Sequence, residues 1–168
     1  MRLDPESTVR AARDAYLDDN GFDMSAYTSK TFALPFLGRE INLPNPPTRQ
    51  RVIARHDLHH ALTGYGTDYI GEAEIGAWEL RAGCNTVFLW FINLAAIGLG
   101  VFLSPRRIWR AWQAGAGQRS LYVDDRELDE LLALELGELR AQRGLPREGL
   151  VRGDVGKASF KAPRSAEA

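Results

Sequence analysis

Apolar residues recur at helical rather than alternating spacing along most of the chain, so the pattern predicts an all-α fold. The first helix is expected between Asp4-Pro5-Glu6 and Asn20-Gly21. The first segment places an N-cap, a first-turn proline and an early acid in the order typical of a helix start, and the second is typical of a helix end. Its apolar face would contain Val9, Ala12, Tyr16 and Leu17.

Residues 22–47 have a mixed pattern that prolines interrupt, as in Leu34-Pro35-Phe36 and in the segment from Leu43 to Pro47. Proline removes a backbone donor and blocks the preceding helical turn. We therefore expect a proline-rich loop that packs across the domain.

Two helices are predicted after this loop. The first covers about residues 48–63, with Thr48 as its N-cap and Gly64 as its stop. The second covers about residues 69–81 and is capped by Asp68. Because the turn between them is short, these two helices can pack against each other.

A long uncharged segment follows, and residues 86–103 form an apolar helix of about 27 Å. A hydrocarbon core is about 30 Å thick, so this helix either spans a membrane or lies buried, where it could line a tunnel for a lipid tail. Asn93, Gly98 and Gly100 favour close packing and the buried position. Ordinary core packing without a ligand is the third alternative.

Ser104-Pro105 opens a basic helix that combines arginines with amphipathic aromatic side chains. This is the pattern of an interfacial anchor to anionic lipid, and the alternative is a solvated helix with its tryptophans in the core. The residues concerned are Arg106, Arg107, Trp109, Arg110 and Trp112.

A last helix is predicted from Asp124 or Asp125 to about Arg143. Its broad apolar face contains Leu128, Leu131, Leu132, Leu136 and Leu139. The whole is expected to be a bundle of about six helices with the long apolar helix at its centre. Residues 1–146 would form one metal- and lipid-binding domain, and residues 147–168 a disordered tail.

The composition is that of one ordinary folded domain, with 168 residues, 45% hydrophobic and 26% charged. The net charge of −1 and the lack of a nucleic-acid motif argue against nucleic acid as a partner. The single cysteine, Cys84, excludes an internal disulfide. The N-terminus lacks the apolar segment of a secretory signal, so we expect an intracellular protein.

All three histidines lie between His56 and His60. These two are four residues apart and project from one face of a helix, and Glu72 at the start of the next helix can face them. Imidazole and carboxylate ligands suit zinc, and equally iron, manganese or cobalt, with positions left open as a catalytic metal requires. The alternative is that the histidines only decorate a helix C-terminus, where positive charge is favourable.

Two known motifs fit this cluster poorly. A zinc-peptidase helix has glutamate where this chain has Asp57, and no edge strand is evident here to bind a peptide. The HD phosphohydrolases need a separate upstream histidine, and no histidine precedes His56.

The pattern His56-Asp57-x2-His60-x11-Glu72 closely resembles the signature of the ubiquinone (coenzyme Q) biosynthesis protein 4 family. The flanking residues 55–65 and 70–72 resemble that family too, as does the order of motif helix, acidic helix and long apolar helix. The resemblance covers about residues 5–145 and is to a short, bacterial-type member.

The resemblance implies an all-α protein that binds a polyprenylated aromatic acid and promotes oxidative decarboxylation at the ring carbon. It makes the chain a metal-dependent decarboxylase or lyase that uses a divalent ion, zinc by family resemblance. His56, Asp57, His60 and Glu72 would be its metal ligands and catalytic positions.

The implied location is the cytoplasm, peripherally at the inner face of the cell membrane. The implied partners are the quinone precursor, the membrane surface, other quinone-biosynthesis enzymes and a second copy of the chain. Candidate lipid or head-group contacts are Tyr65, Trp78, Arg106, Arg107 and Arg110.

Two alternatives remain open from the sequence. One is a non-catalytic scaffold that binds a prenyl lipid and organises quinone-biosynthesis enzymes. The other is the same scaffold acting on another aromatic or prenylated acid.

Overall fold

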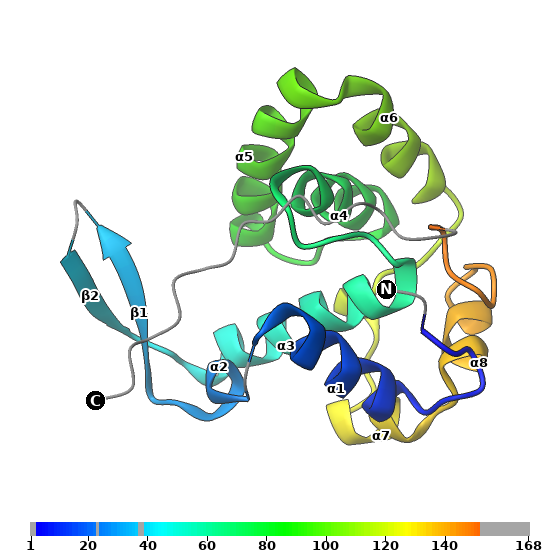
Figure 1. The fold of residues 1–168 in the computed structure, drawn as a ribbon, viewed down its shortest axis with the longest axis horizontal. Helices are drawn as coiled ribbons and strands as arrows, with labels where there is room; N and C mark the ends of the chain where they lie inside the picture. The colour runs from blue at the N-terminus through cyan, green and yellow to red at the C-terminus, as the bar shows by residue number, and fades with distance from the viewer. Residues whose placement is uncertain (1–2, 23, 37–38, 152–168) are drawn as a thin grey trace.

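Two helices, α3 (Pro47–Thr63) and α4 (Tyr69–Ala82), lie in the middle of the computed structural model (Figure 1). The structure describes residues 3–22, 24–36 and 39–151. This part of the chain is mostly helical, with one small two-stranded sheet. The predominantly helical fold is therefore confirmed, while the strictly all-α description is not.

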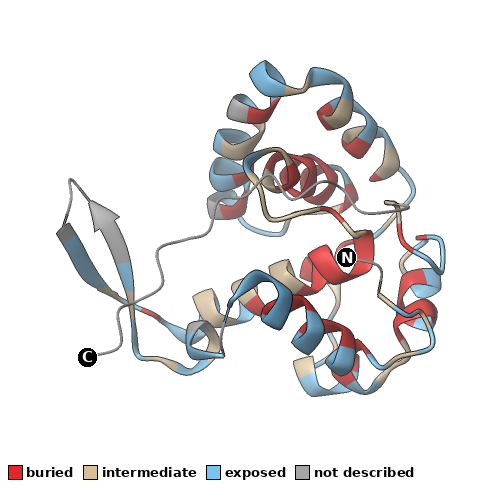
Figure 2. Ribbon diagram, viewed as in Figure 1, coloured by how far each residue is buried: buried red, intermediate tan, exposed pale blue. Residues whose placement is uncertain are grey.

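The C-terminal half of α3 and nearly all of α4 are buried, as Figure 2 shows in red. On one side α3 packs against α1 (Val9–Asn20), α7 (Leu128–Ala133) and α8 (Leu136–Gln142). The predicted apolar faces of the first and last helices supply this part of the core. Its largest side chains include Leu58, Leu62, Trp78, Leu131, Leu132, Leu136 and Leu139.

On its other side α4 packs against α5 (Val87–Leu103) and α6 (Pro105–Ala114). The helix predicted over residues 86–103 is confirmed, and Thr86 is its cap, accepting a hydrogen bond from the Leu89 amide. However, α5 lies at the edge of the molecule rather than at its centre (Figure 1).

The prediction that the apolar helix α5 is buried is wrong for most of its described length. The strongest example is Phe102, which is 89% exposed. Among the described residues, no helix is both long and apolar enough to cross a membrane. Among the described side chains, the other large apolar residues of α5 and α6 that are exposed are Val87, Trp90, Phe91, Ile92, Leu94, Val101, Leu103 and Trp109.

The predicted proline-rich loop contains regular structure instead. A short helix, α2 (Ser25–Thr28), is followed by the hairpin of β1 (Thr31–Phe36) and β2 (Arg39–Pro44), which extends away from the helices (Figure 1). Proline is tolerated at the ends of strands and on edge strands, and in a two-stranded sheet both strands are edges. Pro44 pairs with Thr31 at the end of the hairpin.

Two predicted helix starts are also shifted. Asp4 and Pro5 belong to a turn, and α1 begins at Val9, with Thr8 as the cap that accepts from the Ala11 amide. Helix α3 begins at Pro47, one residue before the predicted cap Thr48. Proline at the first helical position has no amide hydrogen to satisfy, so it starts this helix without a side-chain cap.

The predicted last helix is two helices. Leu134 and Glu135 are extended, and Glu135 forms an isolated bridge with Thr8. The Val9 amide donates to the Leu134 carbonyl at 2.8 Å, which ties the start of α1 to the junction of α7 and α8. Helix α7 begins at Leu128, after its N-cap Glu127, which forms a capping box with Glu130.

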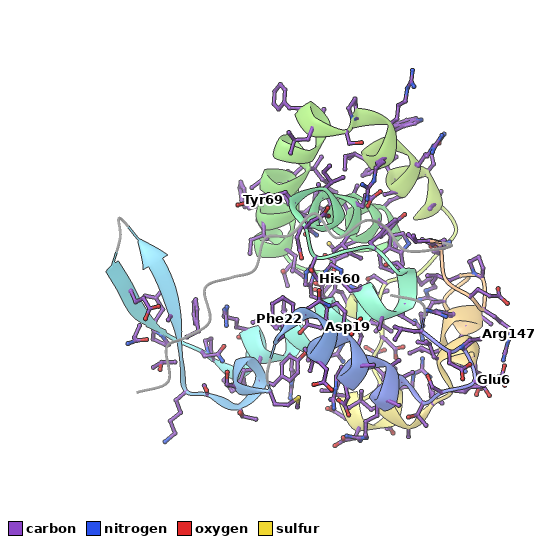
Figure 3. All side chains as sticks on the ribbon, viewed as in Figure 1. Glu6, Asp19, Phe22, His60, Tyr69 and Arg147 are labelled. Carbon is purple, nitrogen blue, oxygen red and sulfur yellow. The ribbon has the colours of Figure 1, made fainter. Side chains whose placement is uncertain are left out.

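The first residues of the expected disordered tail are ordered. The amides of Leu150 and Val151 donate to the Thr63 carbonyl, and Arg147 forms ion pairs with Glu6 and Glu135 (Figure 3). The buried guanidinium of Arg140 donates to the carbonyls of Ala61, Leu62 and Arg147 at 2.8, 2.9 and 2.6 Å. Residues 152–168 of the predicted tail lie outside the described residues.

Candidate metal centre

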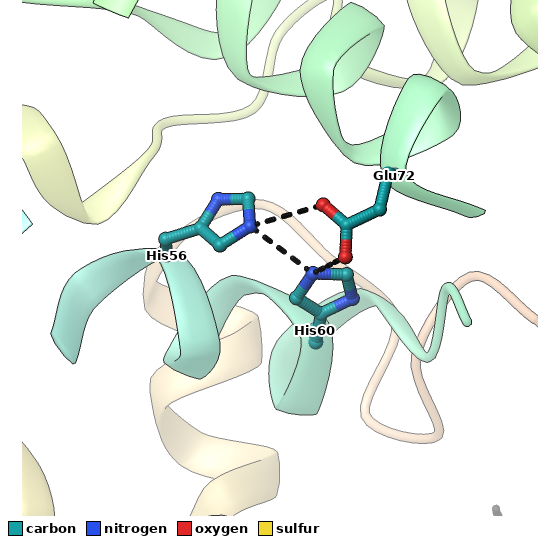
Figure 4. A group of neighbouring side chains, drawn as sticks. All are labelled: His56, His60 and Glu72. Atoms are coloured by element: carbon teal, nitrogen blue, oxygen red, sulfur yellow. Dashed lines mark hydrogen bonds and ion pairs between the residues drawn. The ribbon is translucent and has the colours of Figure 1, made fainter. Parts of the chain in front are cut away.

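The structure brings His56, His60 and Glu72 together, as the sequence predicts (Figure 4). His56 and His60 lie in the last turns of α3, and Glu72 lies in the first turn of α4. Each offers one ligand atom, and these atoms all lie within 4.8 Å of one another. This group could hold a metal ion.

The connection between the two helices follows the predicted signals. Gly64 has φ +83° and ends α3, a conformation that favours glycine. Asp68 caps α4 by accepting from the Gly71 amide at 2.6 Å. A side chain on Gly71 would overlap the carbonyl oxygen of Gly66. Glycine at position 71 therefore allows the connection to pack tightly against the first turn of α4, which carries Glu72.

The distances in the group match those of a small metal centre. The His56 and His60 Nε2 atoms are 3.3 Å apart, and the two Glu72 oxygens lie 3.3 Å from His56 Nε2 and 3.4 Å from His60 Nε2. A tetrahedral ion with bonds of about 2.0–2.1 Å places its ligand atoms about 3.3 Å apart. The residues therefore fit a cation bound by two imidazoles and one carboxylate.

The other ring nitrogens face hydrogen-bond acceptors. His60 Nδ1 lies 3.1 Å from the Tyr65 carbonyl and His56 Nδ1 lies 2.9 Å from Glu79 Oε1. A carbonyl or an ionised carboxylate can only accept, so both Nδ1 atoms carry protons and donate. Both Nε2 lone pairs are consequently left for a cation, the arrangement seen in histidine ligands of metals generally.

The charges of the group are coupled. Burial disfavours the charged form of His56, but Glu79 and Glu72 outweigh it and raise the pKa of His56 well above its ordinary value. Burial alone would raise the pKa of Glu72, but its contacts with His56 and His60 lower this pKa well below the ordinary range. Without a metal, a proton on His56 would thus be held between two carboxylates, and a cation competes for the same place.

Asp57, the fourth predicted ligand, has a different contact in this structure. The Tyr27 hydroxyl donates to its carboxylate across the face of α3. Burial is the main reason that the pKa of Asp57 is raised. Asp57 lies beside the group formed by His56, His60 and Glu72 rather than within it.

One aromatic side chain of α1 covers the group. The Tyr16 ring stacks on His60, with centroids 5.4 Å apart and planes at 16°. His60 is buried where α1, α3 and α4 come together (Figure 3), whereas the Glu72 side chain keeps 39% of its surface exposed. Access from solvent is therefore on the Glu72 side.

The candidate lipid contacts are divided between the core and the surface. Trp78 is fully buried and donates to Gln118 at 2.5 Å. Arg106 and Arg110 are exposed. Arg107 forms a two-point ion pair with Glu74, with distances of 2.8 and 2.6 Å. Tyr65, Arg107 and Arg110 share one hollow of about 460 Å³, which Glu74, Ala114, Leu150 and Val151 complete.

The sequence did not reveal the role of Glu79. This carboxylate is 0% exposed and contacts both His56 and His59. The only signal was its position two turns after Glu72 on the same helix, within an otherwise apolar segment. His59 occupies a variable position of the motif. Its Nε2 atom accepts from the Leu121 amide, and it is not part of the group formed by His56, His60 and Glu72.

Comparison with protein-family models, with curated proteins and with solved structures gives no match to this chain. The resemblance to the ubiquinone biosynthesis protein 4 family thus depends on the motif, its flanking residues and the order of the helices, and it stays a hypothesis.

Proposed function

We propose that the chain is a metal-dependent protein that binds a polyprenylated aromatic acid and promotes decarboxylation at the ring carbon, in ubiquinone biosynthesis. One observation carries the proposal: the Nε2 atoms of His56 and His60 converge with the Glu72 carboxylate at the spacing of metal ligands. Those residues are also three of the four motif positions of the family that the sequence resembles.

A bound divalent ion would supply positive charge to a substrate carboxylate or phenolate and stabilise negative charge that develops on the ring. The protein's own residues hold the ligands and restrict water. Tyr16 covers one face of His60, and Tyr65 and Glu79 fix the orientation of the two imidazoles. Zinc suits this ligand set, and iron or manganese would be favoured if oxygen also enters at the ring carbon.

We also propose peripheral association with the inner face of the cell membrane. The exposed apolar surface of α5 and α6, hereafter the α5–α6 surface, lies next to the exposed Arg106 and Arg110. Apolar and aromatic side chains beside arginines are typical of proteins that bind anionic lipid. A polyprenyl substrate resides in a membrane, so such a surface suits the proposed reaction.

The experiment is to measure metal and quinones for Glu72→Gln, with Glu138→Gln as the matched control. Glu138 is exposed on α8, outside the metal-ligand group. We expect the wild type and Glu138→Gln, purified without a histidine tag, to contain about one divalent ion per chain by elemental analysis. Glu72→Gln should lose most of it, because a neutral amide is a poor ligand.

In a strain that lacks its own copy of the gene, wild type and Glu138→Gln should restore quinone synthesis, and Glu72→Gln should accumulate the carboxylated precursor. If Glu72→Gln loses its metal but still restores quinone synthesis, the catalytic function is wrong. The large α5–α6 surface would then favour the second candidate, a lipid-binding scaffold for other quinone-biosynthesis enzymes.

A further inference from the structure

Glu79 is the most connected side chain near the candidate metal centre. It is fully buried on α4. Its Oε1 accepts from His56 Nδ1 at 2.9 Å, His59 Nδ1 at 2.7 Å and the Tyr122 hydroxyl at 3.1 Å. Its Oε2 accepts from Asn93 Nδ2 at 2.9 Å. A single carboxylate therefore joins α3, α4, α5 and the turn at residues 121–123.

The protons in this network have only one consistent arrangement. His59 Nε2 accepts from the Leu121 amide at 2.8 Å, so the proton of neutral His59 is on Nδ1 and points to Glu79. The hydroxyl of Tyr122 and the amide of Asn93 likewise donate. Glu79 must accept in each contact, and His56 must donate to it through Nδ1.

The charge of Glu79 agrees with this arrangement. Burial alone would raise its pKa, but the two histidines outweigh burial and lower the pKa of Glu79 well below its ordinary range. Glu79 and Glu72 together bring two negative charges to one partly buried group, and a divalent cation would balance both.

From this geometry we infer that Glu79 is the positioning residue of the metal centre. It fixes the His56 ring so that the Nε2 lone pair points to the cation, and its negative charge makes that imidazole a stronger ligand. Its contacts are on the Nδ1 side of the rings, so it acts through His56 and not as a ligand. This role rests on the proposed metal centre.

The network also explains the one buried polar side chain of the apolar helix α5. Asn93 is buried and donates to Glu79, so it sets the register of α5 on α4 at the level of the metal centre. An unpaired amide at this position would be costly, and a slip of α5 along α4 would break the contact.

The test compares Glu79→Gln with Glu74→Gln. Both remove a negative charge from a buried glutamate of α4, but Glu74 pairs with Arg107 instead of the histidines. With Co²⁺ as the probe, we expect Glu79→Gln to bind roughly 10- to 100-fold more weakly than wild type, and Glu74→Gln to bind like wild type. The visible absorption of bound Co²⁺ should change only in Glu79→Gln.

A purely structural role for Glu79 would lower stability without altering the spectrum of the bound ion, so an unchanged spectrum and affinity in Glu79→Gln overturns the positioning role alone. Absence of Co²⁺ binding in the wild type would overturn the metal centre and this role together. If Glu79→Gln does not fold by circular dichroism, Glu79→Asp keeps the charge and shortens the reach. It should then bind Co²⁺ at least severalfold more weakly, and wild-type affinity would overturn the inference.

Discussion

The α3–α4 interface and the α5–α6 surface depart from ordinary protein structure in opposite ways. At the interface, two imidazoles and a carboxylate are enclosed between helices. On the α5–α6 surface, large apolar side chains such as Phe91 and Phe102 face outward. Burial of apolar groups and hydration of polar groups would favour the reverse in both places. Both departures fit the proposals above, in which a cation binds inside and lipid binds outside.

The two regions also differ in the kind of contacts that hold them in place. Polar atoms at the interface are linked by directed hydrogen bonds, including those of Glu79, Tyr65 and Asp68. Helices α5 and α6 are held to α4 by packing, by the Asn93–Glu79 contact and by the Arg107–Glu74 ion pair. Removing a contact at the interface should thus destabilise the fold, while removing an exposed side chain from the surface should mainly affect binding.

The same substitution in both regions gives the largest expected contrast. Gly71→Ala places a Cβ against the backbone of Gly66 and should lower the free energy of unfolding by about 1–3 kcal/mol. Gly98→Ala on α5 meets no atom within 4 Å and should raise it by up to about 1 kcal/mol, because alanine favours helix. Urea denaturation measures both. Equal changes in the two variants would contradict the comparison.

The affinity for metal should depend on pH. The raised pKa of His56 means that its proton stabilises the folded metal-free protein at low pH, and this stabilisation is lost as the pH rises through that pKa. Binding a cation displaces the proton, so affinity should rise about tenfold per pH unit below the folded pKa and level off above it. Calorimetry with Zn²⁺ in buffers of different ionisation enthalpy measures both affinity and proton release. Binding without proton release at low pH would contradict this.

The smallest effect on stability is expected on the α5–α6 surface. Phe102→Ser should change the free energy of unfolding by less than about 0.5 kcal/mol because the side chain is already exposed. Its binding to vesicles that contain phosphatidylglycerol should nevertheless weaken by about tenfold, the contribution of one inserted aromatic ring. Ile41→Ser, an exposed apolar position on the hairpin, is the matched control and should bind like wild type. Equal binding by all three proteins in sedimentation would argue against the lipid surface.

The sequence predicted most accurately those features of the fold that depend on local signals. Asp68 and Gly64 mark the helix ends beside the metal centre, and the four-residue spacing of His56 and His60 places both on one face. These signals depend on neighbours along the chain, so they can be read without the fold. They were enough to predict three residues of the metal-ligand group.

Features that depend on distant partners were missed. The break at Glu135 exists because this residue pairs with Thr8, far away in sequence. Strands β1 and β2 contain prolines that locally indicate a loop, and they form because they pair with each other. In the sequence Glu79 looks like any glutamate of a helix. Its role becomes visible only in the fold, where His59 and Tyr122 donate hydrogen bonds to it.

Arg140 has a consequence for how the metal centre would assemble. Its guanidinium donates to the carbonyls of Ala61 and Leu62 near the end of α3. The helix that carries both imidazoles is therefore held in place by a contact within the chain and not only by an ion. The entropy of ordering the ligands is then lost during folding rather than when an ion is captured. In this respect the chain differs from a zinc finger, which collapses around its ion. If an ion binds as proposed, we expect a chelator to remove it without unfolding the chain, and another ion to replace it.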